Sequence, residues 1–589
     1  MAEQKTFETY DFEKHAPIKG YPELHWTGKR PFTSTQYFPA QLKERFGEEK
    51  RDWINKIFWG DNLQVMSHLL KDYRGKIDLI YIDPPFDSKA DYKKKIQLKG
   101  KTIQNDSTSF EEKQYEDIWT NDEYLQYIYE RLILIRELLS LNGSLFVHCD
   151  WHKNHHLRCL MDDIFGMENF RNEIIWYYYN KMQGNVNRFA SNHDTILVYS
   201  KSKAPTYHKL REERAQSITQ IKRVWDSVSQ KLVNAKDEYG KVIYIESDDK
   251  TVDDVWIVPM LQPADKTENL SYPTQKREEI LERIILSSSN PNDLVFDCFM
   301  GSGTTQAVAM KLGRRFLGAD INLGAIQTTT KRLLKVASEL DGGAQQTLPE
   351  EINEDTKYTG FEVYNVNNYD IFRNPVEARD LIIDALGIQK FDVGNVYDGE
   401  LDGRMVKIMP INRIATKADL NELIDKFPYK TFENRKAASP TDPVEHITLV
   451  CMGHEPDLKA TLEQELSEYK LDIEIVDLLR DKAELRFKHE AEADITIERG
   501  ELVIKEFYPL NLMQKLSMQK EFVENWKQLV ESVMIDWNYD GAVLHPSVID
   551  VPEKEGLVKG RYSVPDDAGH VRVKITDLLS ESLEMDVDA

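Results

Sequence analysis

The chain is poor in cysteine and has no long apolar run, and both absences restrict what it can be. Its 589 residues include only four cysteines, so the sequence offers neither a disulfide framework nor a cysteine-based metal motif. No apolar stretch approaches the length that crosses a membrane. The N-terminus lacks the apolar core of a secretory signal. We therefore expect a globular protein of the cytoplasm without a metal site.

One tetrapeptide, Asp83-Pro84-Pro85-Phe86, stands out from the rest of the chain. It ends the apolar run at residues 77–82, which predicts a short buried strand. Two prolines cannot continue a strand ladder, because each lacks an N–H and has a fixed φ. The chain must turn there in a stiff shape that holds a carboxylate, a carbonyl and an aromatic face together. A flat ligand with an amino group, such as a nucleobase, suits that arrangement, although the same tetrapeptide also occurs in plain turns.

A second motif is a glycine-rich turn between a strand and a helix. Residues 293–297 predict the strand and residues 306–312 the helix, with Gly301 and Gly303 between them. Glycines allow a ligand close to the backbone, and a helix N-terminus offers free N–H groups. Another strand, at residues 315–320, ends in an acid that suits ribose hydroxyls. Because the third glycine of a dinucleotide site is missing, a cofactor with a single nucleoside is favoured.

Together the two motifs resemble the β class of amino-group DNA methyltransferases, in which the Asp-Pro-Pro-Phe motif precedes the Phe-x-Gly-x-Gly motif. The resemblance covers about residues 55–335, and the longer arrangement is similar to the modification subunit of type III restriction-modification systems. Four further segments match the class in the expected order, and they are residues 59–63, 143–148, 193–201 and 272–276.

The resemblance implies an α/β fold with a Rossmann-like class I methyltransferase sheet, in a circularly permuted motif order, and S-adenosylmethionine as cofactor. It assigns the catalytic role to Asp83, Pro84, Pro85 and Phe86. Ordinary packing is an equal alternative for two of the cofactor residues, Phe296 and Phe299. The residues expected to bind the cofactor are Asp61, Thr274, Lys276, Phe296, Asp297, Phe299, Gly301, Gly303, Thr304, Thr305 and Asp320.

The implied reaction is site-specific methyl transfer to the N6 amino group of adenine in double-stranded DNA, after the base has been flipped out of the helix. Transfer to cytosine N4 is the alternative in the same class, although enzymes of that kind more often carry Ser in place of Asp83. A third possibility is a DNA-recognition subunit that guides a helicase-nuclease partner. Methylation of RNA or protein is less favoured, because the chain has room for an inserted DNA-recognition region.

The negative charge of the chain is concentrated in its C-terminal part. Residues 1–350 carry 48 Lys and Arg against 51 Asp and Glu, whereas residues 351–589 carry 28 against 49, within a net charge of −24. A near-neutral catalytic part can still hold a basic cleft for phosphates. The expected DNA-binding side chains follow the catalytic turn, and they are Lys89, Lys93, Lys94 and Lys95.

The sequence also predicts a division into domains. Residues 1–50 form an N-terminal arm and residues 51–338 a catalytic domain, whose target-recognition region is inserted at about 175–265. In the C-terminal part we expect a helix across residues 512–535 and a β-rich module from 543 to 587. A linker at residues 339–357 leads to an acidic α+β region, residues 358–589, which is expected to dock a partner subunit or a second copy in a homodimer.

Overall fold

The fold is described for most, but not all, of the chain, in a computed structural model. The described residues are 9–12, 23–85, 91–99, 109–116, 121–181, 189–262, 265, 268–270, 272, 274–341, 357–366, 379, 382–383, 386–391, 396–410, 415, 417–439, 442–451, 454, 458–477, 491–518, 523, 525–552 and 556–587. Every structural statement below refers to these residues.

A ten-stranded sheet forms the centre of the molecule, in the order β15-β9-β10-β8-β5-β16-β17-β4-β18-β3. Its strands from β8 through β5, β16, β17 and β4 to β18 pair in parallel, and β10 and β3 pair antiparallel at the two sides. The strands are β3 (Gln41–Phe46), β4 (Asn55–Trp59), β5 (Ile77–Ile82), β8 (Leu139–Cys149), β9 (Phe170–Tyr177), β10 (His193–Ser200), β15 (Val255–Ile257), β16 (Leu294–Asp297), β17 (Arg315–Asp320) and β18 (Phe361–Asn365).

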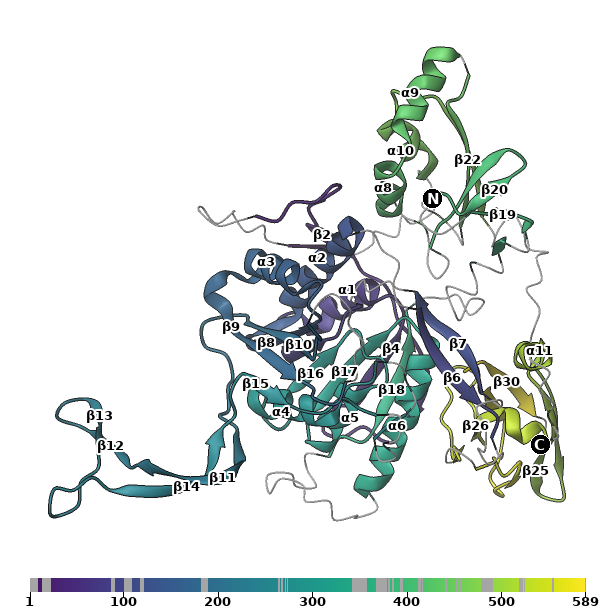
Figure 1. The fold of residues 1–589 in the computed structure, drawn as a ribbon. Coiled ribbons are helices and arrows are strands. Elements are labelled where there is room, and N and C mark those ends of the chain that lie inside the picture. The colour runs from purple at the N-terminus through teal and green to yellow at the C-terminus, as the bar shows by residue number, and fades with distance from the viewer. Residues whose placement is uncertain are drawn as a thin grey trace.

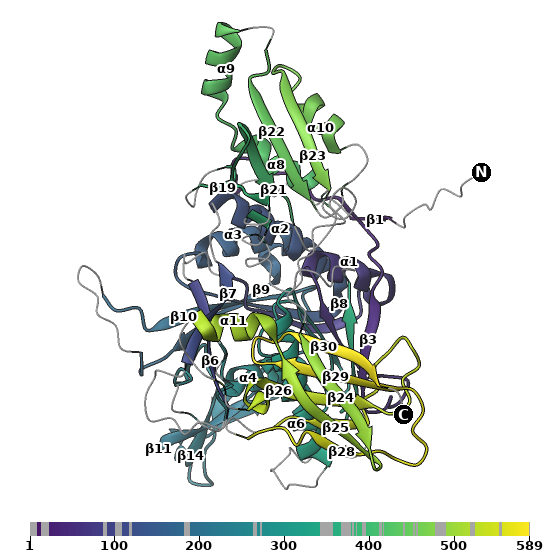
Figure 2. The ribbon, with the colours of Figure 1, turned by 90° about the vertical axis from the view of Figure 1, so that its right-hand side faces the viewer.

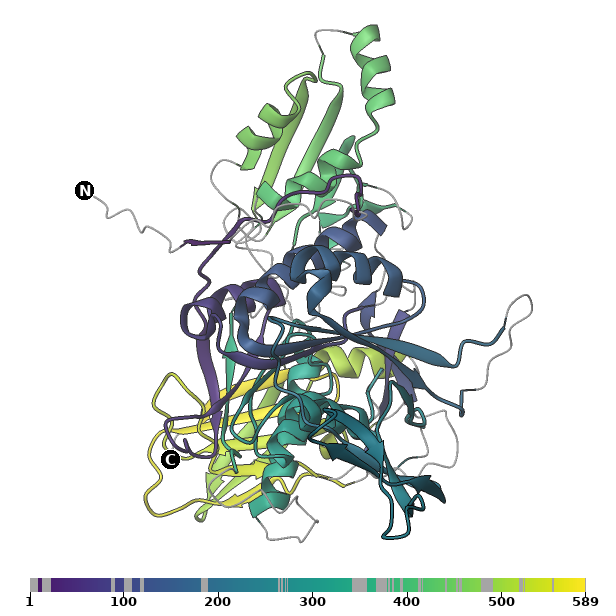
Figure 3. The ribbon, with the colours of Figure 1, turned by 90° about the vertical axis from the view of Figure 1, so that its left-hand side faces the viewer.

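Helices cover both faces of this sheet (Figures 1 and 3). Successive residues of β5 point to opposite faces, so Ile80 packs in one apolar cluster and Leu79 in the other. The first cluster includes side chains of α1, α2 and α3, and the second includes side chains of α4, α5 and α6. These helices are α1 (Asn62–Tyr73), α2 (Asn121–Leu138), α3 (Asn154–Phe165), α4 (Glu278–Ser288), α5 (Thr304–Lys311) and α6 (Leu323–Asp341).

A long two-stranded arm projects from the sheet at the lower left of Figure 1. In it β11 (Arg211–Ile221) pairs antiparallel with β14 (Tyr244–Thr251), and β12 (Arg223–Asp226) pairs with β13 (Lys231–Asn234) near the tip. The arm lies within the region predicted for target recognition. The rest of that region contributes β10, as expected, and also β15 and the end of β9 to the central sheet.

The C-terminal part forms two separate bodies, which Figure 2 shows at opposite ends of the molecule. The first has a five-stranded sheet and the second has two small antiparallel sheets. The first body contains β19 (Gln389–Lys390), β20 (Gly399–Leu401), β21 (Arg404–Ile408), α8 (Lys417–Asp425), α9 (Tyr429–Ala438), β22 (Glu445–Cys451), α10 (Leu458–Glu465) and β23 (Leu471–Asp477). The second, the C-terminal module, contains β24 (Glu492–Glu498), β25 (Glu501–Tyr508), α11 (Leu510–Met518), β26 (Val530–Asp536), β27 (Val548–Asp550), β28 (Arg561–Ser563), β29 (Val571–Asp577) and β30 (Ser582–Val587).

The C-terminal module is docked on the central sheet at β3. Glu44 of β3 forms a β-bridge with Leu544 and a buried ion pair with Lys574 of β29. Leu544 also joins the apolar cluster of the sheet. The module therefore packs against the catalytic part as an extension of its core.

The same module holds the segment that follows the catalytic motif. There β6 (Asp91–Gln97) and β7 (Ser109–Glu116) pair only with each other among the described strands. A two-stranded ribbon alone is marginally stable. Leu98, directly after β6, is buried in a cluster with leucines of the module, and the Lys99 N–H donates to Gln528 O at 3.4 Å. These contacts anchor the end of the ribbon (Figure 1).

The sheet extends past both predicted boundaries of the catalytic domain. The strand β3 falls within the predicted arm at residues 1–50, and β18 falls within the predicted region 358–589. Neither strand carries a motif, and each owes its place to pairing with a distant segment, since β18 lies between β4 and β3.

The predicted helix across residues 512–535 is wrong. The helix α11 ends at Met518, and the strand β26 begins at Val530. This strand lies between β27 and β29 and is buried on both faces. A continuous apolar run of that kind cannot be distinguished from a buried helix by its periodicity. The predicted β-rich module is confirmed for residues 543–587, where β27 to β30 lie, but it begins earlier, with β24.

Among the described residues, no helix has the length and apolar character required to cross a membrane.

Replacing Glu44 with Gln should destabilise the docked module. The change removes the closer of two carboxylates that pair with Lys574, which is buried at the interface, and leaves Glu584 Oε1 at 4.0 Å. Losing one partner of a buried pair costs roughly 3 kcal/mol. Urea denaturation would measure the loss. Lys335→Gln, which breaks the exposed pair with Glu339 in α6, is the control and should cost only about 0.5 kcal/mol. Equal losses in the two variants would contradict the buried pairing.

Candidate active site

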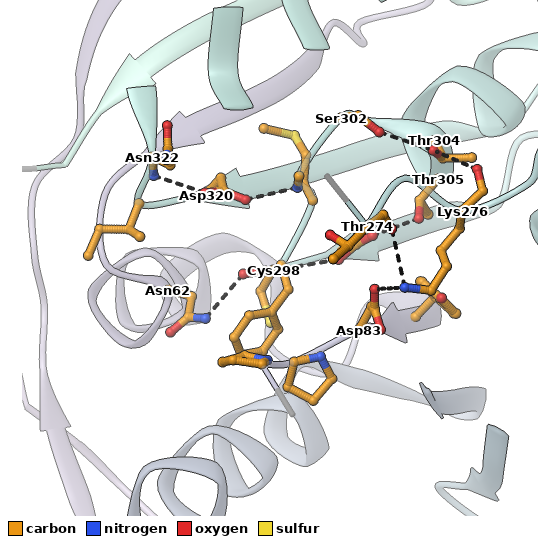
Figure 4. A pocket seen from close by; sticks show the side chains of 18 of the residues that line it. Asn62, Asp83, Thr274, Lys276, Cys298, Ser302, Thr304, Thr305, Asp320 and Asn322 are labelled. Atoms are coloured by element: carbon orange, nitrogen blue, oxygen red, sulfur yellow. Dashed lines mark hydrogen bonds and ion pairs between the residues drawn. The ribbon is translucent and has the colours of Figure 1, made fainter. Parts of the chain in front are cut away.

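A pocket opens where β5, β16 and β17 end, at the carboxyl edge of the parallel strands. Its walls come from segments that are more than two hundred positions apart in the chain, and Figure 4 shows their side chains facing one space. The lining residues are Asp61, Asn62, Tyr81, Asp83, Pro84, Pro85, Tyr127, Tyr272, Thr274, Gln275, Lys276, Leu281, Asp297, Cys298, Phe299, Met300, Gly301, Ser302, Thr304, Thr305, Asp320, Ile321 and Asn322.

The pairing of two strands creates this pocket. In the sheet β16 lies directly beside β5, with Val295 opposite Leu79 and Phe296 opposite Ile80. Because the two strands are parallel, their carboxyl ends emerge at the same edge. Asp83 follows one strand, and the turn with Gly301 follows the other. The sequence prediction that these two motifs share one site is therefore confirmed.

The two carboxylate oxygens of Asp83 differ in their partners. Its Oδ2 forms an ion pair with Lys276 Nζ, which Figure 4 shows as a dashed line. Its Oδ1 is buried and has no hydrogen-bond partner among the described residues. His148 Nδ1 lies 3.6 Å from that oxygen. A buried carboxylate oxygen without a donor suits a ligand that brings one.

The glycine-rich turn places backbone groups at the pocket wall. Gly301 and Gly303 have φ of 52° and 70°, a region that favours glycine. The Gly301 N–H donates to Asp320 Oδ2 at 2.8 Å, and Asn322 N donates to Asp320 Oδ1 at 2.9 Å. The helix α5 begins at Thr304, immediately after the turn. The turn therefore joins the ends of β16 and β17 around one face of the pocket.

Two carboxyl groups, the buried Asp297 and the half-buried Asp320, give the pocket its electrostatic character. Burial raises the pKa of Asp297 to about 7 and the pKa of Asp320 to about 6. Hydrogen bonds oppose this rise, from Thr305 Oγ1 and Phe299 N to Asp297. Burial costs a carboxylate its hydration. A cation that enters the pocket would stabilise the charged form of both groups.

The end of the pocket beside α1 is built around a buried arginine. Arg131 donates to Asp61 Oδ2 at 3.0 Å and to Asn62 Oδ1 at 2.5 Å, and its guanidinium lies 3.4 Å from the centre of the Tyr127 ring. Asn62 in turn donates to Cys298 O at 3.1 Å. Asp61 also caps α1 through Leu63 N. These contacts fix Asp61 and the aromatic wall in place.

Most of the predicted site residues line the pocket, but Phe296 and Gly303 do not. Lys276, predicted to hold the cofactor, lines the pocket and is paired there with Asp83. Phe296 does not line the pocket and packs wholly buried in the core, which was the alternative given for it. Gly303 shapes the turn without lining the pocket. The predicted residues that do line it are Asp61, Asp83, Pro84, Pro85, Thr274, Lys276, Asp297, Phe299, Gly301, Thr304, Thr305 and Asp320.

Five predicted residues are not tested by this geometry. Phe86 and Lys89 lie outside the described residues. Lys93, Lys94 and Lys95 belong to β6, where only the course of the backbone is described.

The sequence analysis missed several lining residues. Asn62 and Tyr272 belong to two of the segments that match the methyltransferase class, residues 59–63 and 272–276. Their place in those segments could have identified them as pocket residues. Tyr127 lies on α2 and gives no signal in the sequence. Among the described residues, no group of three or more His, Cys, Asp or Glu side chains is arranged to hold a metal ion.

Comparisons with known proteins place the chain in a family. A family model described as DNA methylase matches residues 77–331. The Type II methyltransferase M1.MboII of Moraxella bovis is 32% identical over 279 residues, which span 46% of this chain and 92% of the relative. The chain therefore belongs to the family of DNA methylases, and the resemblance inferred from its motifs is confirmed.

Two further proteins match at lower sequence identity. The Mod subunit of the Type III restriction-modification enzyme EcoP15I of Escherichia coli is 26% identical over 212 residues, which span 33% of this chain and 30% of that protein. The crystal structure of the M1.HpyAVI-SAM complex covers 47% of this chain and 98% of its own, at 21% sequence identity and a TM-score of 0.29.

Replacing Gly303 with Ala should destabilise the glycine-rich turn. A Cβ there would lie 2.5 Å from Thr329 Cγ2, in addition to the strain of a φ of 70°. Gly75→Ala is a matched control, because Gly75 has a φ of 69° and nothing within 4 Å of the added Cβ. We expect Gly303→Ala to cost at least about 1 kcal/mol more than the control. Equal losses in thermal or urea denaturation would contradict the close contact.

Proposed function

We propose that this protein methylates the N6 amino group of adenine in double-stranded DNA, with S-adenosylmethionine as methyl donor. The observation that carries the proposal is the meeting of the Asp83 turn and the Gly301 turn in one pocket. Membership of the DNA methylase family supports it. We further propose that the sheet is a circularly permuted class I methyltransferase sheet, since the catalytic strand precedes the cofactor strand in the chain.

The residues of the glycine-rich turn fit the proposed cofactor. The backbone at Gly301 can approach a ligand closely, and a side chain in its place would meet the ring of Tyr272 at 3.4 Å. Asp320 would bind the ribose, and Asp61 would face the adenine end beside Tyr127 and Phe299. When bound, the cofactor supplies a methyl group on a positively charged sulfur. The two carboxyl groups Asp297 and Asp320 would offset that charge.

Asp83 would receive the target base. Its buried Oδ1 can accept a hydrogen bond from the amino group, and so can the Pro84 carbonyl. The ion pair between Lys276 and Oδ2 orients the carboxylate, and Oδ1 is left to accept from the base. Accepting these hydrogens draws the nitrogen lone pair out of conjugation with the ring. Orientation and electrostatics of this kind can supply much of the rate enhancement.

The base must leave the helix before it can reach Asp83. Extrusion costs a few kcal/mol of stacking and pairing. Phe86 would stack on the base and recover part of this, since such stacking contributes ~1–3 kcal/mol. The lysines at 89, 93, 94 and 95 would bind phosphates, and the arm of β11 to β14 would read the recognition sequence.

Cytosine N4 is the alternative target, because both targets are aromatic amino groups. Asp at position 83 favours adenine. The likeness to the EcoP15I Mod subunit supports a role in restriction-modification, where this chain would direct a helicase-nuclease partner. We also propose a homodimer, for which the acidic C-terminal region would supply the docking surface.

Replacing Asp83 with Ala should abolish methyl transfer and leave cofactor binding intact, because the carboxylate contacts the base and not the cofactor. We expect the transfer rate to fall by at least about 10²-fold. DNA from cells that express the chain should contain N6-methyladenine, measured by mass spectrometry of nucleosides. Asp72→Asn, at an exposed position of α1, is the control and should methylate normally.

Full activity of Asp83→Ala would contradict the assignment of Asp83 as a catalytic residue. If DNA methylated by the wild-type protein contains N4-methylcytosine and no N6-methyladenine, the target is cytosine N4 and not adenine N6.

Cofactor affinity should rise between about pH 5 and about pH 8, and cofactor binding should release protons, by linkage. The pKa values of Asp297 and Asp320, about 7 and about 6, leave both groups largely protonated at the acidic end. A bound cation favours their charged forms. Calorimetry in buffers of different ionisation enthalpy would count the protons. S-Adenosylhomocysteine, which lacks the positive charge on sulfur, should show a weaker pH dependence; an equal dependence for both ligands would contradict this coupling.

A further inference from the structure

A buried histidine lies behind the catalytic carboxylate. His148 in β8 is 0% exposed, and its Nδ1 lies 3.1 Å from Tyr81 Oη and 3.6 Å from Asp83 Oδ1. Its Nε2 lies 3.5 Å from Asp194 Oδ2. One imidazole therefore stands between two carboxylates inside the protein. Burying such polar groups is costly. The imidazole meets Tyr81 Oη at hydrogen-bond distance and the two carboxylates at ion-pair distance.

The second carboxylate is itself fixed. Tyr178 Oη donates to Asp194 Oδ1 at 3.1 Å. Burial works to raise the pKa of Asp194, but the close contact with His148, the hydrogen bond from Tyr178 and the charge of Lys276 bring it below the ordinary value. Burial and the neighbouring Asp194 raise the pKa of Tyr178, so its hydroxyl stays a donor. Asp194 is thus a charged anchor at the far side of the imidazole.

Neighbouring strands of the sheet hold these groups in place. Tyr81 is in β5, His148 in β8 and Asp194 in β10, and in the sheet β8 lies between the other two. The Trp176 ring of β9 contacts the His148 ring edge to face, with centroids 5.4 Å apart. Because strands in a sheet are rigidly spaced, the imidazole cannot move without disturbing its neighbours.

We propose that His148 and Asp194 form a positioning pair for the catalytic carboxylate. Asp83 stands at the end of a strand, and a carboxylate can rotate about its last bond. Lys276 restrains Oδ2, whereas the Tyr81–His148 contact faces Oδ1. The pair keeps Oδ1 aimed at the space where the amino group arrives. It acts through Asp83 and touches neither base nor cofactor. This inference rests on the proposed function and deepens it.

Small errors in the position of a reacting group can reduce a rate about 10²-fold. Loss of the pair should therefore slow the methyl-transfer step and spare binding. Single-turnover transfer in the full chain, with binding constants for S-adenosylmethionine and for a DNA duplex, separates the two effects. We expect His148→Gln and Asp194→Asn each to slow transfer by about 10-fold to 10²-fold, with both dissociation constants within about twofold of wild type.

The double variant distinguishes a working pair from two independent residues. If His148 and Asp194 act as a unit, the double variant should be no slower than the slower single variant. If the rate loss of the double variant equals the product of the two single losses, the residues act independently and the proposal is overturned.

A tyrosine pair in the same fold supplies the matched control. Tyr199 in β10 is as buried as Tyr178, and it donates to Asp162 Oδ1 at 2.5 Å, away from the pocket lining. Tyr178→Phe should slow transfer, whereas Tyr199→Phe should lose a similar amount of stability with no change in the transfer rate. This pair of variants also decides the matter if His148→Gln does not fold.

Normal transfer rates in folded His148→Gln and Tyr178→Phe would overturn the positioning pair, as would a loss explained entirely by weaker cofactor binding. Failure of the proposed function has a different signature. In that case wild-type protein would not methylate DNA, or Asp83→Ala would methylate it at the full rate.

Discussion

The parallel pairing of β5 with β16 is the contact on which the rest of the site depends. Only two residue pairs, Val295 with Leu79 and Phe296 with Ile80, define its register. A slip of one residue would exchange the faces of β16, since side chains alternate. Phe296 would then move from the apolar cluster on one face to the cluster on the other, and the Gly301 turn would no longer face Asp83. The apolar clusters on both faces of the sheet oppose such a slip.

The polar groups of the pocket depend on one another in the same way. Asp83 is paired with Lys276, Asp320 accepts from the Gly301 turn, and Arg131 holds Asp61. Each buried charge is thereby given a partner or hydrogen bonds, which is the condition for burying charge at all. Two carboxyl groups, Asp297 and Asp320, stay poorly solvated, with raised pKa values. The pocket therefore favours a cation near Asp297 and Asp320 and a neutral hydrogen-bond donor near Asp83.

The acidic C-terminal part has a structural role that its composition did not suggest. Its module docks on β3 through Glu44 and Lys574 and anchors the segment after the catalytic motif through Leu98. The contacts include an ion pair and a β-bridge at the edge of the sheet and a small leucine cluster. A region that was expected to dock a partner subunit thus also supports its own catalytic part. The docking of a partner subunit or a second copy stays a prediction.

The sequence by itself determined the strands and turns that carry motifs. Residues 77–82 and 315–320 form β5 and β17 as predicted, and Asp83, Gly301 and Asp320 lie at one pocket. Short apolar runs bounded by Pro or Gly leave few alternatives to a buried strand.

Only the tertiary structure decided which polar side chains pair with one another. The Lys276–Asp83 pair, the Arg131 cluster and the His148–Asp194 contact each join segments far apart in the chain. Local patterns carry no information on such contacts, because they form only when the sheet brings the strands together. The same reason explains why β3 and β18 fell outside the predicted domain and why β26 was mistaken for helix.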